Sequence, residues 1–143
     1  MGVKRGDLSV TIGEFKALCK KGHLQSATQI LHLLEEQGYK KSSYTYVCLL
    51  QGCTQSNALE EGKLIHGNVI KYESDTNIFI YTTIIHMYAR CGSFEDARVV
   101  FDRMSERNLV TWSTMIEAYC QHERHEEALD AFLRMRKEGL VAC

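Results

Sequence analysis

Residues 91–104 read CGSFEDARVVFDRM, and this stretch contains the pattern from which the fold can be predicted. An acidic pair precedes Ala97, and Phe101 and Met104 follow at steps of four and three residues. Such steps place the three apolar side chains on one face of a helix. The same skeleton returns at residues 123–135, ERHEEALDAFLRM. The recurrence predicts a repeated helical unit.

A small residue occupies the same position of the skeleton in four units. These residues are spaced by 35, 35 and 31 positions: Ala27, Gly62, Ala97 and Ala128. About fifteen residues upstream of each lies a second apolar frame at helical spacing. Each unit is therefore predicted to be a pair of helices. The eight expected helices span residues 11–21, 24–37, 46–56, 59–72, 81–91, 94–106, 112–122 and 125–138.

The turns between paired helices carry matching stop and start signals. Gly22 and Gly92 stand where first helices should end, because Gly adopts the left-handed cap conformation without a steric penalty. Ser93 and Asn57 each precede an acid by three residues, the spacing of a side chain that caps the start of a second helix. These signals predict short helix hairpins.

The whole sequence fits one all-α domain, residues 1–143. It contains no apolar run near the length of a membrane-spanning helix, and no proline. The stretch NIFIYTTII is β-like, but its position in the repeat assigns Ile78–Ile80 to a linker and the rest to a helix. A hairpin of this size cannot bury its apolar face alone, so neighbouring units are expected to stack.

Residues that could carry catalysis or bind a metal have simpler interpretations. The six cysteines form no C-x-x-C pair, and Cys19, Cys53 and Cys120 have the phase of small core side chains. The segment CQHERH, residues 120–125, suggests a metal site, but helical residues two apart do not face one another. Glu126 and its neighbour lie in the first turn of a helix, where acids complement the helix dipole. We predict no catalytic site, no metal and no cofactor.

Two stretches carry a family resemblance. Residues 81–139, YTTIIHMYARCGSFEDARVVFDRMSERNLVTWSTMIEAYCQHERHEEALDAFLRMRKEG, resemble the pentatricopeptide repeat family, and ALEEGKLIHGNVIK, residues 58–71, resembles the long-type repeat of its plant-organelle PLS subclass. The resemblance divides the chain into a P-type unit (8–42), a long-type unit (43–77), a short-type unit (78–108) and a second P-type unit (109–143). It implies a right-handed α-solenoid of four stacked helix-turn-helix repeats.

The resemblance also implies that the first helices bind single-stranded RNA, approximately one base per repeat. Two side chains per repeat would hydrogen-bond to each base, and apolar side chains of neighbouring units would sandwich its face. In the third unit these two residues are Thr82 and Asn108, a pair that resembles the family's adenine reader. The base-reading positions of the other units are Ile12 with Ser42, Val47 with Asn77, and Ser113 with Cys143. The candidate sandwiching residues are Tyr44, Phe79 and Val110, and the candidate phosphate contacts are Lys20 and Arg90.

Base discrimination is expected mainly from the third unit. Val47 is apolar, Ile12 with Ser42 is not a recognised pair, and Cys143 replaces the closing Asp or Asn of the fourth unit. Each residue also has a structural interpretation: Thr82 can be a solvated threonine and Asn108 a residue that terminates a helix. The formal net charge of −1 indicates few phosphate contacts and a shallow dependence of affinity on salt.

The resemblance implies a role in organellar RNA processing, namely recognition of C-to-U editing sites in a chloroplast or mitochondrion. The sequence lacks the C-x-x-C pair of the deaminase that performs editing, so we predict no enzymatic activity. It ends on the last residue of a repeat, which leads us to expect a short member or a fragment. The alternative is an adaptor superhelix that binds accessory editing or splicing proteins. Neither function requires a membrane or a small-molecule substrate.

Overall fold

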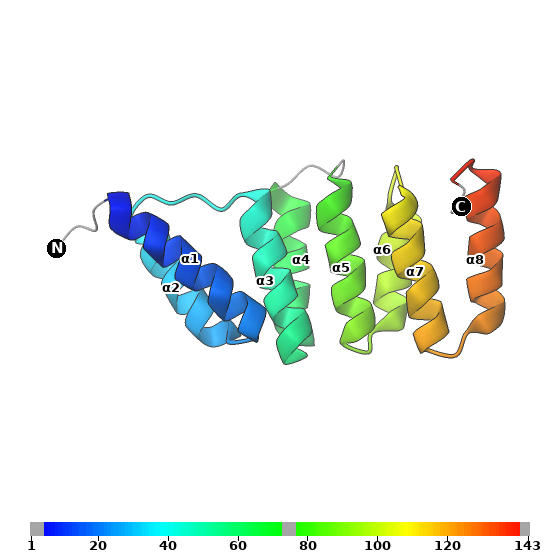
Figure 1. Cartoon of the computed structure of the whole chain (residues 1–143), viewed down its shortest axis with the longest axis horizontal. Helices are drawn as coiled ribbons and strands as arrows, with labels where there is room; N and C mark the ends of the chain where they lie inside the picture. Colours follow the sequence, from blue (N-terminus) through cyan, green and yellow to red (C-terminus); the bar gives the residue numbers. More distant parts are fainter. Residues whose placement is uncertain (1–4, 73–76, 141–143) are drawn as a thin grey trace.

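The computed structural model describes residues 5–72 and 77–140, and within them it forms eight helices and no strand (Figure 1). The helices are α1 (Arg5–Lys21), α2 (Leu24–Glu36), α3 (Ser43–Ser56), α4 (Leu59–Tyr72), α5 (Ile78–Arg90), α6 (Phe94–Arg103), α7 (Leu109–Gln121) and α8 (His125–Lys137). The prediction of an all-α chain of paired helices is confirmed.

The helices stack as an α-solenoid. Each first helix packs on the first helix of the next unit, which gives the continuous row α1, α3, α5 and α7 in Figure 1. The second helices α2, α4 and α6 each contact the first helix of their own unit and that of the following unit. Every unit except the terminal ones is therefore held on both sides by nearest neighbours, as expected for a repeat protein.

The small residues of the skeleton are buried, and one of them lies where a second helix approaches the first helix of the next unit. Ala27 and Ala97 have no exposed surface, and Ala128 is buried as well. At Gly62, a Cβ atom would lie 2.5 Å from the sulfur of Met87, which reaches over from α5. These contacts explain why the repeat requires a small side chain at this position.

Backbone conformation confirms the predicted helix ends at Gly22 and Gly92, which have φ angles of 79° and 82°. Two predicted helix starts differ from the structure. The Asn57 residue is the left-handed C-cap of α3, with φ 55°, and does not cap α4. At the start of α6, the Ser93 hydroxyl donates to the Asp96 carboxylate and does not accept a backbone N–H.

The first helices begin earlier than predicted. The assignment of Ile78–Ile80 to a linker was wrong, because α5 begins at Ile78 and Ile80 is fully buried. Side chains that precede α3, α5 and α7 cap them: Asn77 accepts from the N–H of Ile80, and Ser42 and Asn108 accept from the residue three positions on. In these three helices the caps, not the first large apolar residue, determine where the helix starts.

Replacement of Ala97 by Leu tests this packing. Ala97 has no exposed surface on α6, which packs on both α5 and α7, so a larger side chain must displace a neighbouring helix. We expect Ala97→Leu to lower the free energy of unfolding by about 1–3 kcal/mol, and the melting temperature measured by circular dichroism to fall accordingly. Val99→Leu enlarges an exposed side chain of the same helix and should leave the melting temperature nearly unchanged. Equal melting temperatures for the two variants would contradict the close approach.

Candidate nucleic-acid interface

The row of first helices carries a groove with a volume of about 490 Å³. Side chains from all four first helices line it, among them Lys20, Gln55, Phe79, Thr82, His86 and Val110. Four of these are site residues predicted from the sequence: one phosphate contact, two sandwiching residues and one base reader. The structure thus brings residues from three predicted roles into one groove.

Two apolar side chains stand exposed at successive positions of the groove. Phe79 on α5 is 64% exposed and Val110 on α7 is 61% exposed, whereas the core aromatics of the same helices are buried. The third predicted sandwiching residue, Tyr44, is also exposed, but the Lys16 ammonium lies 4.5 Å from its ring centroid. Phe79 and Val110 therefore offer free apolar surface, and Tyr44 already has a cation over its ring.

Thr82 and Asn108 are linked by a third residue. Thr82 is buried, with 8% of its surface exposed, and its Oγ1 lies 3.0 Å from Oγ1 of Thr111 on α7. The Asn108 Oδ1 accepts from the backbone N–H and from the hydroxyl of Thr111, each at 2.9 Å. Asn108 is thus the N-cap of α7, and it is exposed. Sequence reasoning missed Thr111, although the Asn-x-x-Thr spacing of a capping box was visible.

The other predicted reading positions have different surroundings. Val47 is only 3% exposed, so its side chain is in the core. Both polar atoms of the Asn77 side chain have partners. Its Nδ2 donates to the Ser43 hydroxyl at 3.2 Å, and its Oδ1 accepts from the backbone N–H of Ile80 at 3.1 Å. Ile12 is half-buried and Ser42 caps α3. Ser113 is exposed, and Cys143 lies outside the described residues.

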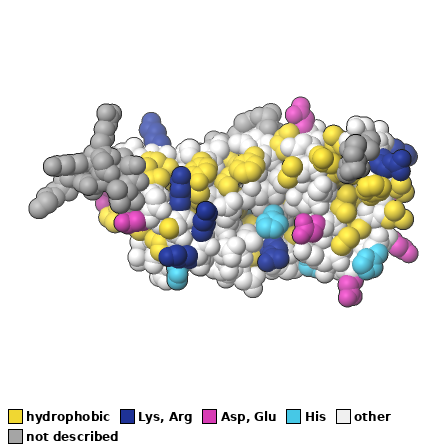
Figure 2. All heavy atoms as spheres, viewed as in Figure 1, with side chains coloured by type: hydrophobic (Ala, Val, Ile, Leu, Met, Phe, Trp, Pro, Cys, Tyr) yellow, Lys and Arg dark blue, Asp and Glu magenta, His cyan; other side chains and the backbone are white. Residues whose placement is uncertain are grey.

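Charged groups are distributed unevenly along this face. Figure 2 shows Lys and Arg side chains gathered over α1, with fewer over the later helices. The predicted phosphate contacts Lys20 and Arg90 are both exposed. Next to Arg90, His86 lies in the groove, and burial lowers its pKa, with Arg90 adding to that effect and Glu117 opposing it. The sequence signal for His86 was its position one turn after Thr82.

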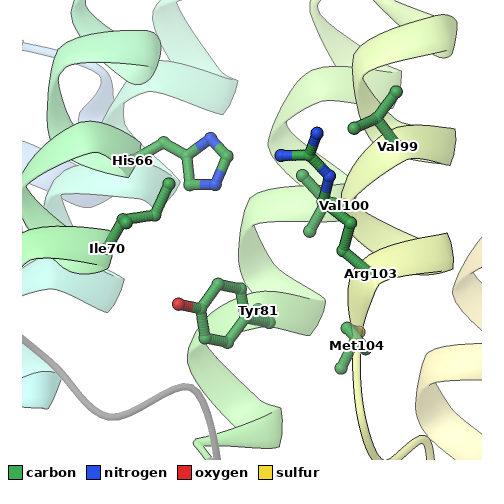
Figure 3. A pocket seen from close by; sticks show the side chains of 7 residues that line it. All are labelled: His66, Ile70, Tyr81, Val99, Val100, Arg103 and Met104. Atoms are coloured by element: carbon green, nitrogen blue, oxygen red, sulfur yellow. The ribbon is translucent and has the colours of Figure 1, made fainter.

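A second cavity, of about 220 Å³, lies between α4 and α6 on the other side of α5 (Figure 3). His66 and Ile70 line it from α4, and Val99 and Arg103 line it from α6. The His66 ring nitrogen Nδ1 is 2.8 Å from the Tyr88 hydroxyl, and burial lowers the pKa of His66. Of the described base-reading residues, none lines this cavity.

The cysteines behave mainly as core side chains. Cys19 and Cys53 are buried, and burial raises the pKa of each thiol to about 12. The expectation for Cys120 was wrong, because it is exposed: in the described part of the chain no further helix packs on that side of α7.

The described residues hold neither a cluster of metal ligands nor a membrane-spanning helix. Within residues 5–72 and 77–140, no three His, Cys, Asp or Glu side chains lie close enough together to hold a metal ion. None of the helices described has the length and apolar character to cross a membrane.

Among known protein families, a family model described as PPR repeat matches residues 79–109 and 110–140 of this chain. The chain is 39% identical over 94 residues to a pentatricopeptide repeat-containing protein of Arabidopsis thaliana, an alignment that covers 66% of this chain and 10% of the relative. A mitochondrial relative from the same plant is 37% identical over 86 residues (60% of this chain, 8% of the relative), and a chloroplastic one is 37% identical over 82 residues (57% and 11%). The chain thus spans about a tenth of the length of these relatives.

Proposed function

On the premise that the chain carries pentatricopeptide repeats, two of them at residues 79–109 and 110–140, we propose that its row of first helices binds single-stranded RNA. The observation that carries this proposal is the seat formed by Phe79, Val110 and Thr82. Two exposed apolar side chains from successive helices flank a hydroxyl in one groove. An unstacked base needs such an arrangement, with apolar contact to its faces and a polar group at its edge.

Of the reading positions, the pair Thr82 and Asn108 is the best suited to discriminate bases. By the family resemblance it prefers adenine. The pair Val47 and Asn77 is poorly suited, because Val47 has no polar group in its side chain and both polar atoms of the Asn77 side chain are engaged. We expect little discrimination at Ile12 with Ser42, and Ser113 leaves the base choice of the fourth unit open.

Backbone contacts make a smaller contribution to the proposed affinity. Lys20 lines the groove and Arg90 is exposed, so these two cations can reach phosphates. The whole chain has a formal net charge of −1, so it lacks the basic surplus of proteins that bind mainly by phosphate neutralisation. Stacking and edge contacts supply most of the affinity.

The biological role that fits is organellar RNA processing, with recognition of C-to-U editing sites as its specific form. Relatives named mitochondrial and chloroplastic support the location, and the P, long, short, P order of units supports the PLS subclass. The second candidate is an adaptor that binds accessory proteins. It is favoured by the cavity between α4 and α6, at which Ile70 and Val99 are exposed.

Fluorescence anisotropy with labelled RNA octamers tests the proposal. Uridine octamers with one central adenine should bind the native chain at low salt, and Phe79→Ala should weaken binding by about 1–3 kcal/mol, because one stacking surface is lost. Leu64→Ala is the matched control, since Leu64 is 72% exposed but lies on the second helix α4. No binding by the native chain, or equal losses for the two variants, would contradict an RNA seat on the first helices.

A further inference from the structure

A fully buried hydroxyl lies between the two base readers of the third unit. Thr111 has no exposed surface, so it cannot touch RNA. Its Oγ1 is nevertheless 3.0 Å from Oγ1 of Thr82 and 2.9 Å from Oδ1 of Asn108. The two readers, 26 positions apart in sequence, are thus connected by two hydrogen bonds through one atom.

The directions of these hydrogen bonds follow from their donors. The backbone N–H of Thr111 donates to the Asn108 side chain, which fixes the amide with its oxygen towards α7, because an NH₂ group cannot accept. The Thr111 hydroxyl donates to the same oxygen and accepts from the Asn108 backbone N–H at 3.3 Å. Its one proton is then used, so the Thr82 hydroxyl must donate to Thr111. In the reverse order the proton of Thr82 would have no acceptor among the described contacts.

This order determines what each reader presents to a base. Thr82 has committed its proton, so towards the groove it offers only oxygen lone pairs. Asn108 has committed its oxygen twice, so it offers only the N–H groups of Nδ2. The pair therefore presents an acceptor beside a donor. Adenine and cytosine complement this order with an amino group next to a ring nitrogen acceptor, whereas guanine and uracil present a carbonyl oxygen next to an N–H.

We propose that Thr111 is a positioning residue that holds Thr82 and Asn108 in an acceptor–donor order, so that the third unit selects amino bases over keto bases. This inference rests on the proposed RNA seat and adds to it a residue that no base contacts. It also gives a physical reason for the pair's preference, which the identities of Thr82 and Asn108 alone do not supply.

The start of α3 provides an internal comparison. Thr45 is buried and forms the same kind of capping box with Ser42 as Thr111 forms with Asn108. The residue of the first unit that corresponds to Thr82 is Ile12, which has no hydroxyl. Thr45 therefore has the capping role without the connection between two readers, and Thr45→Val is a matched control for Thr111→Val.

The test compares uridine octamers that carry a central A, C, G or U. The native chain should bind the A and C octamers about tenfold more tightly than the G and U octamers. In Thr111→Val the Thr82 proton becomes free to donate to a carbonyl. The gap, meaning the ratio of affinities for the A and C octamers over the G and U octamers, should therefore fall to about twofold or less. Thr111→Ser should retain the gap, and so should Thr45→Val. If Thr111→Val does not fold by circular dichroism, Thr111→Ala removes the same hydroxyl with a smaller side chain.

The possible outcomes distinguish failure of the positioning role of Thr111 from failure of the proposed RNA binding. Binding by the native chain with a gap that Thr111→Val leaves intact would overturn the positioning role and leave the RNA seat standing. Equal binding of all four octamers by the native chain would likewise overturn the positioning role of Thr111 and leave the proposed RNA binding standing. Failure of the native chain to bind any octamer would overturn both. Loss of the gap in Thr111→Val, with retention in Thr111→Ser and Thr45→Val, would support the inference.

Discussion

Trp112→Ala is expected to lower the free energy of unfolding by about 3–5 kcal/mol. Trp112 is fully buried, and its ring meets Phe101 edge to face with centroids 4.9 Å apart. The guanidinium groups of Arg107 and Arg134 lie 5.7 and 5.4 Å from its centroid. Because these partners come from the third and fourth units, the substitution leaves a cavity between two repeats. The indole Nε1 is buried without a hydrogen-bond partner in the described structure, so its removal offsets part of the loss.

The interface position should also change how the chain unfolds. In a stacked array each unit depends on its neighbours, so weakening one interface uncouples the fourth unit from the rest. Urea denaturation followed by far-UV circular dichroism should show a lower midpoint and a broader transition. Phe79→Ala removes an aromatic ring that is 64% exposed and should change the free energy of unfolding by no more than about 0.5 kcal/mol. Similar losses in both variants would mean that Trp112 is not part of the inter-repeat core.

The repeat skeleton was sufficient to predict the second helices but not the starts of the first helices. An apolar face with a small residue at its centre, as around Ala97, is visible in sequence because most of its members are buried. The start of a first helix depends instead on a polar cap, such as Asn77 at α5. Asn has several roles at helix ends, and its spacing to an acid misled the prediction at Asn57, where the backbone required a left-handed residue.

The candidate site was predictable in its members but not in its connections. The family resemblance was enough to predict Phe79, Thr82 and Val110, and the structure places them in one groove. The connection through Thr111 depends on the distance between side chains 29 positions apart on different helices. Sequence spacing contains no such distance, and burial of Val47 by its neighbours was equally invisible.

Asn108→Asp is expected to change the preferred base from adenine to guanine. One carboxylate oxygen can accept the two hydrogen bonds from Thr111 that the Asn108 oxygen now accepts. The other replaces the Nδ2 donor with an acceptor. Beside the lone pair of Thr82, the site then presents two acceptors, which complement the N1–H and amino group of guanine. A matched edge contributes about 1–3 kcal/mol of discrimination, so the ratio of adenine to guanine affinity should reverse. The fold should persist, because Asp is as good an N-cap as Asn.

The measurement is the ratio of affinities for the adenine and guanine octamers, by anisotropy at low salt. Asn77→Asp is the matched control: Asn77 also caps a first helix, but its partner Val47 is buried and apolar. The added negative charge should weaken binding of every octamer by a similar factor in both variants. Only Asn108→Asp should change the ratio. If both variants lower the affinity without changing the ratio of adenine to guanine affinity, Asn108 acts through charge and helix capping alone. If the ratio reverses in Asn108→Asp and not in Asn77→Asp, Asn108 contacts the edge of the base.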